Sequence, residues 1–190
     1  MSIAGIVLAG GKSSRYGTPK MFETYKGKHL YEYSVDALRE NRLSPIIIST
    51  NSELRPCFKR TDVHYIIENE LEAHQGPLFA LYNVISNEQK AEWFFVLSCD
   101  IPFVTSCFVR EIIAIAKGTH SFDVILPTQS GRDQPLLALY HRRSLSKMKQ
   151  TLSSNKRSLR VLLNELNVRT VPFSRDENIF ININYKEDWH

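Results

Sequence analysis

IAGIVLAGGKSSRYGTPK, residues 3–20, combines a strand pattern with a glycine-containing loop. Its first six residues form a short apolar run with β-branched members, which is typical of a buried strand. Gly10 and Gly11 follow that run, and residues without a Cβ let backbone amides approach a ligand closely. Serines, lysines and an arginine flank the glycine pair, and such groups bind phosphate oxygens. This stretch therefore predicts a strand that leads into a phosphate-binding loop.

Two common nucleotide-binding motifs do not fit this loop. A P-loop needs a glycine five places before Gly11, and that position is Ile6. The dinucleotide pattern G-x-G-x-x-G also fails, because the glycines of the loop are Gly10, Gly11 and Gly17. An anion cradle of another type and a surface loop with solvated charges remain, and the position directly after the first strand favours the cradle.

The rest of the chain alternates between strand and helix patterns. Further strands are predicted near residues 46–50, 63–67, 93–97, 122–127, 135–140 and 169–172. Helices are predicted near residues 30–41, 77–85, 106–116, 142–152 and 158–166. This alternation predicts an α/β fold of three layers, with a mainly parallel central sheet and helices on both of its faces. Because no repeat or linker divides the chain, we expect a single domain over residues 1–190.

In sheets of this kind, ligands bind outside the carboxyl ends of the strands. The loops after Leu8, Ile67 and Leu97 are therefore the places where chemistry is expected. The run Trp93–Leu97 is the most apolar strand pattern, which predicts a place at the centre of the sheet.

The composition excludes several classes of protein. Hydrophobic residues make up 43% of the chain and charged residues 23%, so extensive disorder is not expected. Three cysteines without a C-x-x-C pair argue against a disulfide framework or a structural zinc site. Neither a membrane-spanning run nor a signal peptide is apparent, and we expect a cytoplasmic protein that does not bind a membrane.

The positive charge is concentrated in one place. The chain has 24 lysines and arginines against 20 acidic residues, a net charge of +4. Residues 12–28 contain five of these cations and one glutamate, so this segment accounts for the whole excess. A nucleic-acid-binding protein would carry its basic residues over a wider surface. The distribution favours a small anionic ligand and no nucleic acid.

Asp100 is the candidate metal ligand. It lies in the segment LSCDIPF, residues 97–103, directly after the most apolar strand. Magnesium commonly binds one or two carboxylates together with substrate phosphates, so Asp100 is well placed to hold Mg²⁺. A carboxylate at this position is costly unless a cation pairs with it, and magnesium is the expected partner. The alternative role for Asp100 is to cap the helix that begins near Thr105.

Weaker signals lie elsewhere in the chain. Gly76-Pro77 is typical of a helix start, where free amides can meet a ligand, and Asn69 can contact a nucleoside. Further polar groups occur at expected strand edges and turns, namely Arg132, Gln134, Asn182 and Asn184. For the two asparagines, simple turn chemistry is the alternative.

Taken together, these motifs resemble the molybdenum cofactor guanylyltransferase family, within the wider group of Rossmann-like nucleotidyltransferases. The first family motif corresponds to residues 8–20, with Tyr16 in place of the usual methionine. The others, in order, correspond to GPL at residues 76–78, CDIPF at 99–103, QPLLALY at 134–140 and NIN at 182–184. The first motif alone is shared with sugar-nucleotide and cytidylyl transferases, so the whole set carries the resemblance.

The resemblance implies roles for individual residues. The catalytic set would be Arg15, Lys20 and Asp100, with Asp100 as the metal ligand. The nucleotide site would comprise Leu8, Ala9, Gly10, Gly11, Lys12, Ser13, Lys20, Asn69, Gly76 and Asp100. The pterin acceptor would contact Arg132, Gln134, Asn182 and Asn184. Two departures from the family pattern affect this assignment: Asn69 replaces a usual aspartate, and Tyr185-Lys186 replaces a usual Thr-Pro.

The implied reaction is the transfer of GMP from GTP to the phosphate of the molybdenum-molybdopterin cofactor, with Mg²⁺ as cofactor and pyrophosphate as the second product. Because the product is labile, molybdoenzymes or their chaperones are expected to contact the protein transiently. Two alternatives remain. One is a cytidylyl or other nucleotidyltransferase on the same fold. The other is a non-catalytic carrier of the pterin cofactor, against which the glycine loop, Lys20 and Asp100 argue.

Overall fold

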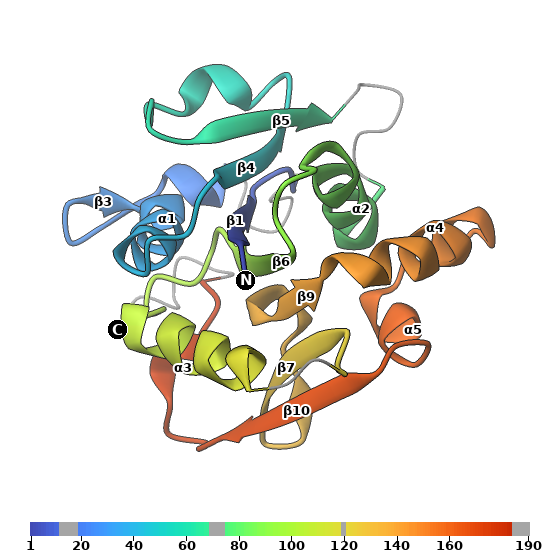
Figure 1. The fold of residues 1–190 in the computed structure, drawn as a ribbon. Coiled ribbons are helices and arrows are strands. Elements are labelled where there is room, and N and C mark those ends of the chain that lie inside the picture. Colours follow the sequence, from blue (N-terminus) through green and yellow to red (C-terminus); the bar gives the residue numbers. More distant parts are fainter. Residues whose placement is uncertain (12–18, 69–74, 119–120, 184–190) are drawn as a thin grey trace.

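The computed structural model describes residues 1–11, 19–68, 75–118 and 121–183 (Figure 1). Its main sheet contains β1 (Ile3–Leu8), β4 (Ile46–Asn51), β5 (His64–Glu68), β6 (Trp93–Ser98), β7 (Val124–Gln129), β8 (Arg132–Asp133), β9 (Leu139–His141) and β10 (Val168–Phe173). The helices are α1 (Leu30–Glu40), α2 (Pro77–Asn87), α3 (Ser106–Lys117), α4 (Leu145–Ser153) and α5 (Leu159–Leu163). A small hairpin is formed by β2 (Thr24–Tyr25) and β3 (Lys28–His29). In the described part of the chain, no helix combines the length and apolar character that crossing a membrane requires.

The central sheet is mainly parallel, as predicted. Its strand order is β10-β7-β9-β6-β1-β4-β5, and β8 pairs with β7 outside this path. The neighbours β6, β1, β4 and β5 are parallel to one another, and β10 is parallel to β7. Strand β9 runs antiparallel to β6 and to β7, so β6 and β7 point the same way. The predicted central place of β6 is confirmed by this order.

Helices cover both faces of the sheet, which confirms the predicted three layers (Figure 1). Successive strand residues point to opposite faces, so Val7 packs in one apolar cluster and Ile6 in the other. The cluster that contains Val7 includes most of the buried apolar residues of α1 and all of those of α3. The cluster that contains Ile6 includes those of α2, α4 and α5.

The segment predicted as one strand over residues 135–140 has two parts. Pro135–Leu137 forms a 3₁₀ turn, and only Leu139–His141 forms a strand. Proline has no N–H to donate to a neighbouring strand, and the Leu137 N–H bonds instead to the Gln134 carbonyl at 3.0 Å. The turn is therefore a local consequence of Pro135.

The helix predicted over residues 158–166 ends earlier, at Leu163. The N–H groups of Glu165 and Leu166 bond to carbonyls three residues earlier, at 2.9 and 3.3 Å, so the chain tightens into turns. Leu166 still packs against the apolar cluster that includes α5. Its apolar spacing therefore indicates burial and not a longer helix.

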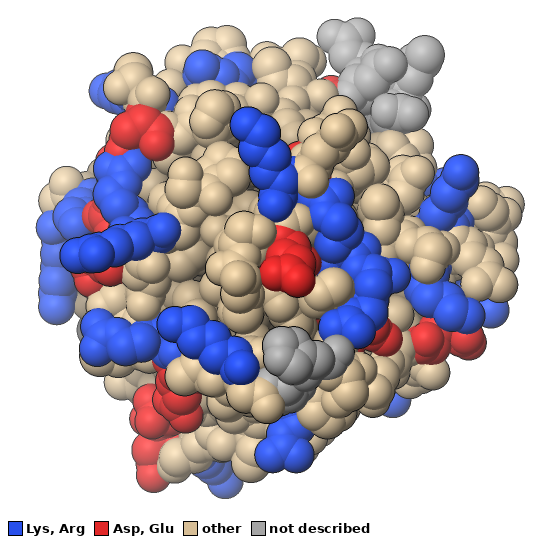
Figure 2. All heavy atoms as spheres, viewed as in Figure 1, with Lys and Arg blue, Asp and Glu red and all other residues tan. Residues whose placement is uncertain are grey.

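The charged side chains on the face shown in Figure 2 form several basic groups with acidic residues among them. Some of the described lysines and arginines pair directly with carboxylates. Arg60 lies 3.0 Å from Asp36 and 2.9 Å from Asp62, and Lys28 lies 2.7 Å from Asp36. These pairs join the start of β3, the helix α1 and the segment before β5.

Candidate functional site

The backbone at the end of β1 is held by side chains of the neighbouring strand β4. The Ala9 N–H donates to the Ser49 carbonyl at 2.8 Å, which extends the strand pairing by one residue. The Thr50 hydroxyl donates to the Ala9 carbonyl at 3.0 Å, and the Asn51 amide donates to the Gly10 carbonyl at 3.3 Å. Both β4 side chains are buried. The start of the glycine loop is therefore fixed in position by β4.

Gly10 is closely approached by the side chain of Glu68. A Cβ at this position would lie 3.2 Å from a carboxylate oxygen of Glu68, the last residue of β5. Glu68 is only 6% exposed, so its carboxylate has little freedom to move away. Gly11, in contrast, is exposed, and a Cβ added there would meet no described atom within 4 Å. The two glycines thus differ: Gly10 accommodates Glu68, and Gly11 leaves open space beside the loop.

Asp100 and Lys20 form an ion pair at the carboxyl end of β6. The Lys20 ammonium donates to the carboxylate at 2.5 Å. The two side chains are 16% and 10% exposed, with Lys20 the more exposed, so the pair is largely shielded from water. The other carboxylate oxygen accepts a hydrogen bond from the Ser98 hydroxyl. The structure therefore brings together two of the three predicted catalytic residues.

Asp100 does not take the alternative role of a helix cap, because Thr105 is the N-cap of α3 and its hydroxyl accepts from the Phe108 N–H at 3.2 Å. The Lys20 ammonium gives the carboxylate a cationic partner from within the protein.

The backbone of Asp100 contacts the C-terminal part of the chain. The Ile183 N–H donates to the Asp100 carbonyl at 3.0 Å. The Ile183 side chain is fully buried with Leu30, and Tyr25 and Phe103 pack against them. Asn182, a predicted acceptor-binding residue, is exposed directly before this anchor. The folded chain therefore places Asn182 next to the Asp100 loop despite their separation in the sequence.

Arg132 and Gln134 lie on another part of the same sheet edge. Arg132 belongs to β8, is exposed, and pairs with Gln129 at the carboxyl end of β7. The Gln134 N–H donates to the Pro127 carbonyl at 2.9 Å. Since β9 separates β7 from β6, these two residues stand to one side of the Lys20–Asp100 pair. Arg132 and Gln134 therefore lie on the same edge of the sheet as the Lys20–Asp100 pair, but beside β7 and not beside β6.

Gly76 begins α2 in a conformation that favours glycine. Its φ is +91°, which places it outside the region that other residues adopt easily. Pro77 follows as the first helical residue, as the sequence predicts. The Arg157 guanidinium donates to the side chain of Gln75, so the segment after α4 lies against the start of α2.

Some predicted site residues fall outside the described part of the chain. These are Lys12, Ser13, Arg15, Asn69 and Asn184. Leu8, Ala9, Gly10 and Gly11 are described and continue from β1 in the predicted order.

Four polar residues of the site were not predicted: Thr50, Asn51, Glu68 and Ser98. Each lies at or near the last position of an apolar strand in the parallel part of the sheet. A polar residue at the end of an apolar run is a signal that the sequence contains, and it could have identified all four. Their partners in the fold could not be identified in the same way, because strand order is needed for that.

Cys99 lies beside Asp100 but is not a candidate nucleophile. Burial raises the pKa of its thiol well above the usual range, and the neighbouring Asp100 charge raises it further. The thiolate is the reactive form of cysteine, so this side chain stays unreactive at neutral pH.

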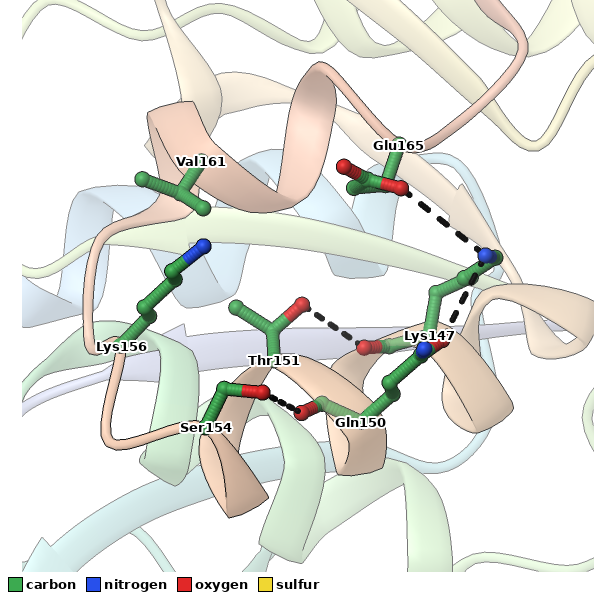
Figure 3. A pocket seen from close by; sticks show the side chains of 7 residues that line it. All are labelled: Lys147, Gln150, Thr151, Ser154, Lys156, Val161 and Glu165. Atoms are coloured by element: carbon green, nitrogen blue, oxygen red, sulfur yellow. Dashed lines mark hydrogen bonds and ion pairs between the residues drawn. The ribbon is translucent and has the colours of Figure 1, made fainter.

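A separate polar hollow of about 110 Å³ lies between α4 and α5 (Figure 3). Its lining residues are Lys147, Gln150, Thr151, Ser154, Lys156, Val161 and Glu165. None of these is a predicted site residue. The Thr151 and Ser154 hydroxyls bond to carbonyls of α4, at 2.8 and 3.1 Å, so they serve the helix itself.

The carboxylate oxygens of Asp100 are suitable ligands for a divalent cation whose other ligands include phosphate oxygens. Across residues 1–11, 19–68, 75–118 and 121–183, no three histidine, cysteine or acidic side chains gather as a ready-made metal site. A single shielded carboxylate is nevertheless a typical protein contribution to magnesium, whose other ligands are water and substrate phosphates.

A family model and a curated relative match most of the chain in sequence, and solved structures match its fold. The family model described as "MobA-like NTP transferase domain" matches residues 5–170. A "Probable molybdenum cofactor guanylyltransferase" from Geobacillus sp. (strain WCH70) is 36% identical over 186 residues, covering 96% of this chain and 93% of the relative. The solved structure of molybdopterin-guanine dinucleotide biosynthesis protein A from Archaeoglobus fulgidus is similar in fold, with a TM-score of 0.77, 22% identity, and coverage of 97% and 94%. A manganese complex of Rv0371C from Mycobacterium tuberculosis has a TM-score of 0.68 and 13% identity, with coverage of 92% and 89%.

Proposed function

Because the chain belongs to the MobA-like NTP transferase family, we propose that it transfers GMP from GTP to the terminal phosphate of the molybdenum-molybdopterin cofactor. The products are the guanine dinucleotide form of the cofactor and pyrophosphate. The names of two relatives support this acceptor, and both relatives match nearly the whole chain.

The observation that carries the proposal is the Lys20–Asp100 pair beside the end of β1. An ammonium and a carboxylate lie 2.5 Å apart, on an edge that also presents the glycine loop. Phosphoryl and nucleotidyl transfer depend on positioning and on positive charge near the phosphates, and they need no covalent nucleophile. Lysine and a metal-binding carboxylate are the groups that such chemistry requires.

The reaction follows from the charges of its partners. An oxygen of the acceptor phosphate forms a bond to the α-phosphorus of GTP while the bond to pyrophosphate breaks on the opposite side. Both partners are anions, so they repel each other until cations reduce the charge between them. We assign this role to Lys20 and to Arg15, and we assign the phosphate-wrapping role to Gly11–Arg15.

Asp100 is the residue that would hold a divalent cation, with Mg²⁺ as our proposal. When bound, such an ion supplies further positive charge to the phosphate oxygens. One oxygen of Asp100 accepts from Ser98 and the other from Lys20, so a bound cation would share the carboxylate with these donors.

Leu8, Ala9, Asn69 and Gly76 complete the proposed nucleotide site. Leu8 and Ala9 continue directly from β1. Gly76 lies at the N-terminus of α2, where helix amides and the helix dipole favour an anion.

We place the pterin acceptor toward Arg132, Gln134, Asn182 and Asn184. The bond from Ile183 to Asp100 supports this for Asn182, because it ties the segment to the metal-binding loop. Because the guanine dinucleotide cofactor is labile, direct transfer to the enzyme that uses it is favourable. Molybdoenzymes or their chaperones are therefore the proposed transient partners.

The test measures pyrophosphate release with GTP, ATP, CTP or UTP, each with Mg²⁺ and the isolated pterin cofactor. We expect release with GTP, dependent on both the metal and the acceptor. The Asp100→Asn variant should lose this release, while the Lys149→Ala variant, altered on the exposed side of α4, serves as a control that keeps it. Preference for CTP would replace the guanylyl assignment with a cytidylyl one. Binding of the pterin without release under any nucleotide would indicate a carrier.

A further inference from the structure

Asp100 receives hydrogen bonds on both carboxylate oxygens, and the two donors come from different places. Lys20 reaches one oxygen from the segment after the glycine loop, at 2.5 Å. The Ser98 hydroxyl reaches the other oxygen from the last residue of β6, two positions before Asp100. Lys20 is a long and flexible side chain, whereas Ser98 has a single rotatable bond before its hydroxyl. The serine is therefore the donor that fixes the orientation of the carboxylate.

Ser98 is itself held in place by helix α1. The hydroxyl of Ser34 donates to the Ser98 carbonyl at 2.7 Å. Ser34 is fully buried on α1, on the side that packs against the sheet. Strand β6 also pairs with β1 through Ser98, opposite Leu8. The hydroxyl that contacts Asp100 thus starts from a strand end fixed by a helix and by a neighbouring strand.

We propose that Ser98 is a positioning residue for Asp100. Its hydroxyl sets the rotation of the carboxylate, and this rotation determines how the carboxylate meets a divalent cation. The inference rests on the proposed function, since it takes Asp100 to be the residue that holds that cation. Removing a group that hydrogen-bonds to a metal ligand and orients it typically lowers metal affinity about 10- to 100-fold.

The experiment measures binding of Mn²⁺ to the protein in the presence of a guanosine triphosphate analogue with a methylene bridge between the α and β phosphates. This analogue cannot be transferred, so the readout is independent of activity. Free Mn²⁺ is measured by electron paramagnetic resonance for the wild type and for the variants Ser98→Ala, Ser98→Thr, Asp100→Asn and Ser49→Ala. Affinity for the analogue without metal and the unfolding temperature are measured on the same samples.

Ser49→Ala is the matched control. Ser49 lies near the end of the neighbouring strand β4, and its buried hydroxyl has no hydrogen-bond partner among the described residues. Removing it deletes the same group from the same type of position, while its backbone carbonyl still accepts from Ala9. This variant should bind Mn²⁺ as the wild type does.

We expect Ser98→Ala to weaken Mn²⁺ binding about 10-fold, with unchanged affinity for the metal-free analogue. Ser98→Thr, which keeps the hydroxyl, should restore most of the Mn²⁺ affinity. Unchanged Mn²⁺ binding in Ser98→Ala would overturn the proposal, provided that Asp100→Asn loses it. Equal losses in the alanine and threonine variants, together with a lowered unfolding temperature, would also overturn it in favour of a purely structural role. If the wild type binds neither Mn²⁺ nor the analogue, the proposed function itself fails.

Discussion

Lys20 and Asp100 show how the balance of charge at one position depends on the fold. They are 80 positions apart in the sequence and 2.5 Å apart in the structure. Both side chains are mostly shielded from water, so the ion pair contributes to the compensation of each charge. A substitution that removes one charge therefore leaves the other in a poorly solvated place.

We predict that Asp100→Asn lowers the free energy of unfolding by about 1–3 kcal/mol in the absence of nucleotide and metal, because a charge-assisted hydrogen bond is lost. Lys20→Gln should have an effect of similar size. The double variant should lose less than the sum of the two, since both single variants remove the same ion pair. Urea unfolding of the four proteins checks this. An Asp100→Asn variant as stable as the wild type would contradict it.

At the level of single residues, the sequence singles out candidate groups but does not reveal their partners in the fold. Asp100 and Lys20 were identified from local motifs, and Gly10 from its place after an apolar run. The ion pair, the contact of Gly10 with Glu68 and the bond from Ile183 to Asp100 could not be predicted. Each joins segments whose proximity depends on strand order, and no local pattern contains that information.

At the level of elements, Arg142, directly after β9, connects the end of α2 to the start of β6. Its guanidinium donates to the carbonyls of Ala91 at 2.7 Å and Ile85 at 3.3 Å, and also to that of Glu88. Ile85 and Glu88 belong to the last turn and the C-cap of α2, whose carbonyls have no partner within the helix. The guanidinium also lies 5.2 Å from the centre of the Phe94 ring in β6.

We predict that Arg142→Ala destabilises the protein by about 2–4 kcal/mol, because three carbonyls lose a charged donor and some of them stay shielded from water. Arg142→Lys should recover part of this, since an ammonium cannot reach all three in the same way. Hydrogen exchange should show faster opening at the end of α2. Lys90→Ala, in the exposed loop between α2 and β6, is the control and should change stability by less than about 0.5 kcal/mol. Unaltered exchange in α2 for the alanine variant would contradict the prediction.

The elements themselves were largely predictable, because apolar runs and helical spacing are local features. The direction of β9 was not. Leu139–His141 is too short to carry a directional pattern, and it is antiparallel to both of its neighbours. The 3₁₀ turn at Pro135–Leu137 brings the Ala138 carbonyl to the Val96 N–H at 2.9 Å, so the turn also joins the sheet. Only the folded structure shows that the residue after this turn and the strand β9 both pair with β6.

For the whole molecule, stability depends on pH through groups whose pKa changes on folding. Burial lowers the pKa of His141 below its usual value, and the nearby Arg143 lowers it further. The ring lies edge-on to Trp93, with 4.7 Å between ring centres, and its Nδ1 accepts from the Arg143 N–H at 3.0 Å. The neutral imidazole is therefore the form that the folded protein favours.

The sign of the pH effect follows from this shift. His141 binds a proton more readily in the unfolded chain, so its contribution to stability is present above a pH of about 6.5 and is lost as the pH falls below that value. We predict that His141→Asn, which keeps an acceptor for the Arg143 N–H, reduces the loss of stability between a pH of about 7.5 and one of about 5.5. Urea unfolding at both pH values checks this. His64→Gln, changed at an exposed position on the edge strand β5, should leave the loss as it is.

The hydrogen bond from Ile183 to Asp100 has a consequence for the order in which the site is completed during synthesis. The ribosome makes β1 first, and Asp100 emerges near the middle of the chain. The residue that binds the Asp100 carbonyl is made more than eighty residues later, as the sequence numbering shows. A nascent chain that already contains the glycine loop, Lys20 and Asp100 therefore still lacks one support of its carboxylate loop. Until Ile183 has been made, the loop that carries Asp100 lacks this hydrogen bond in the growing polypeptide.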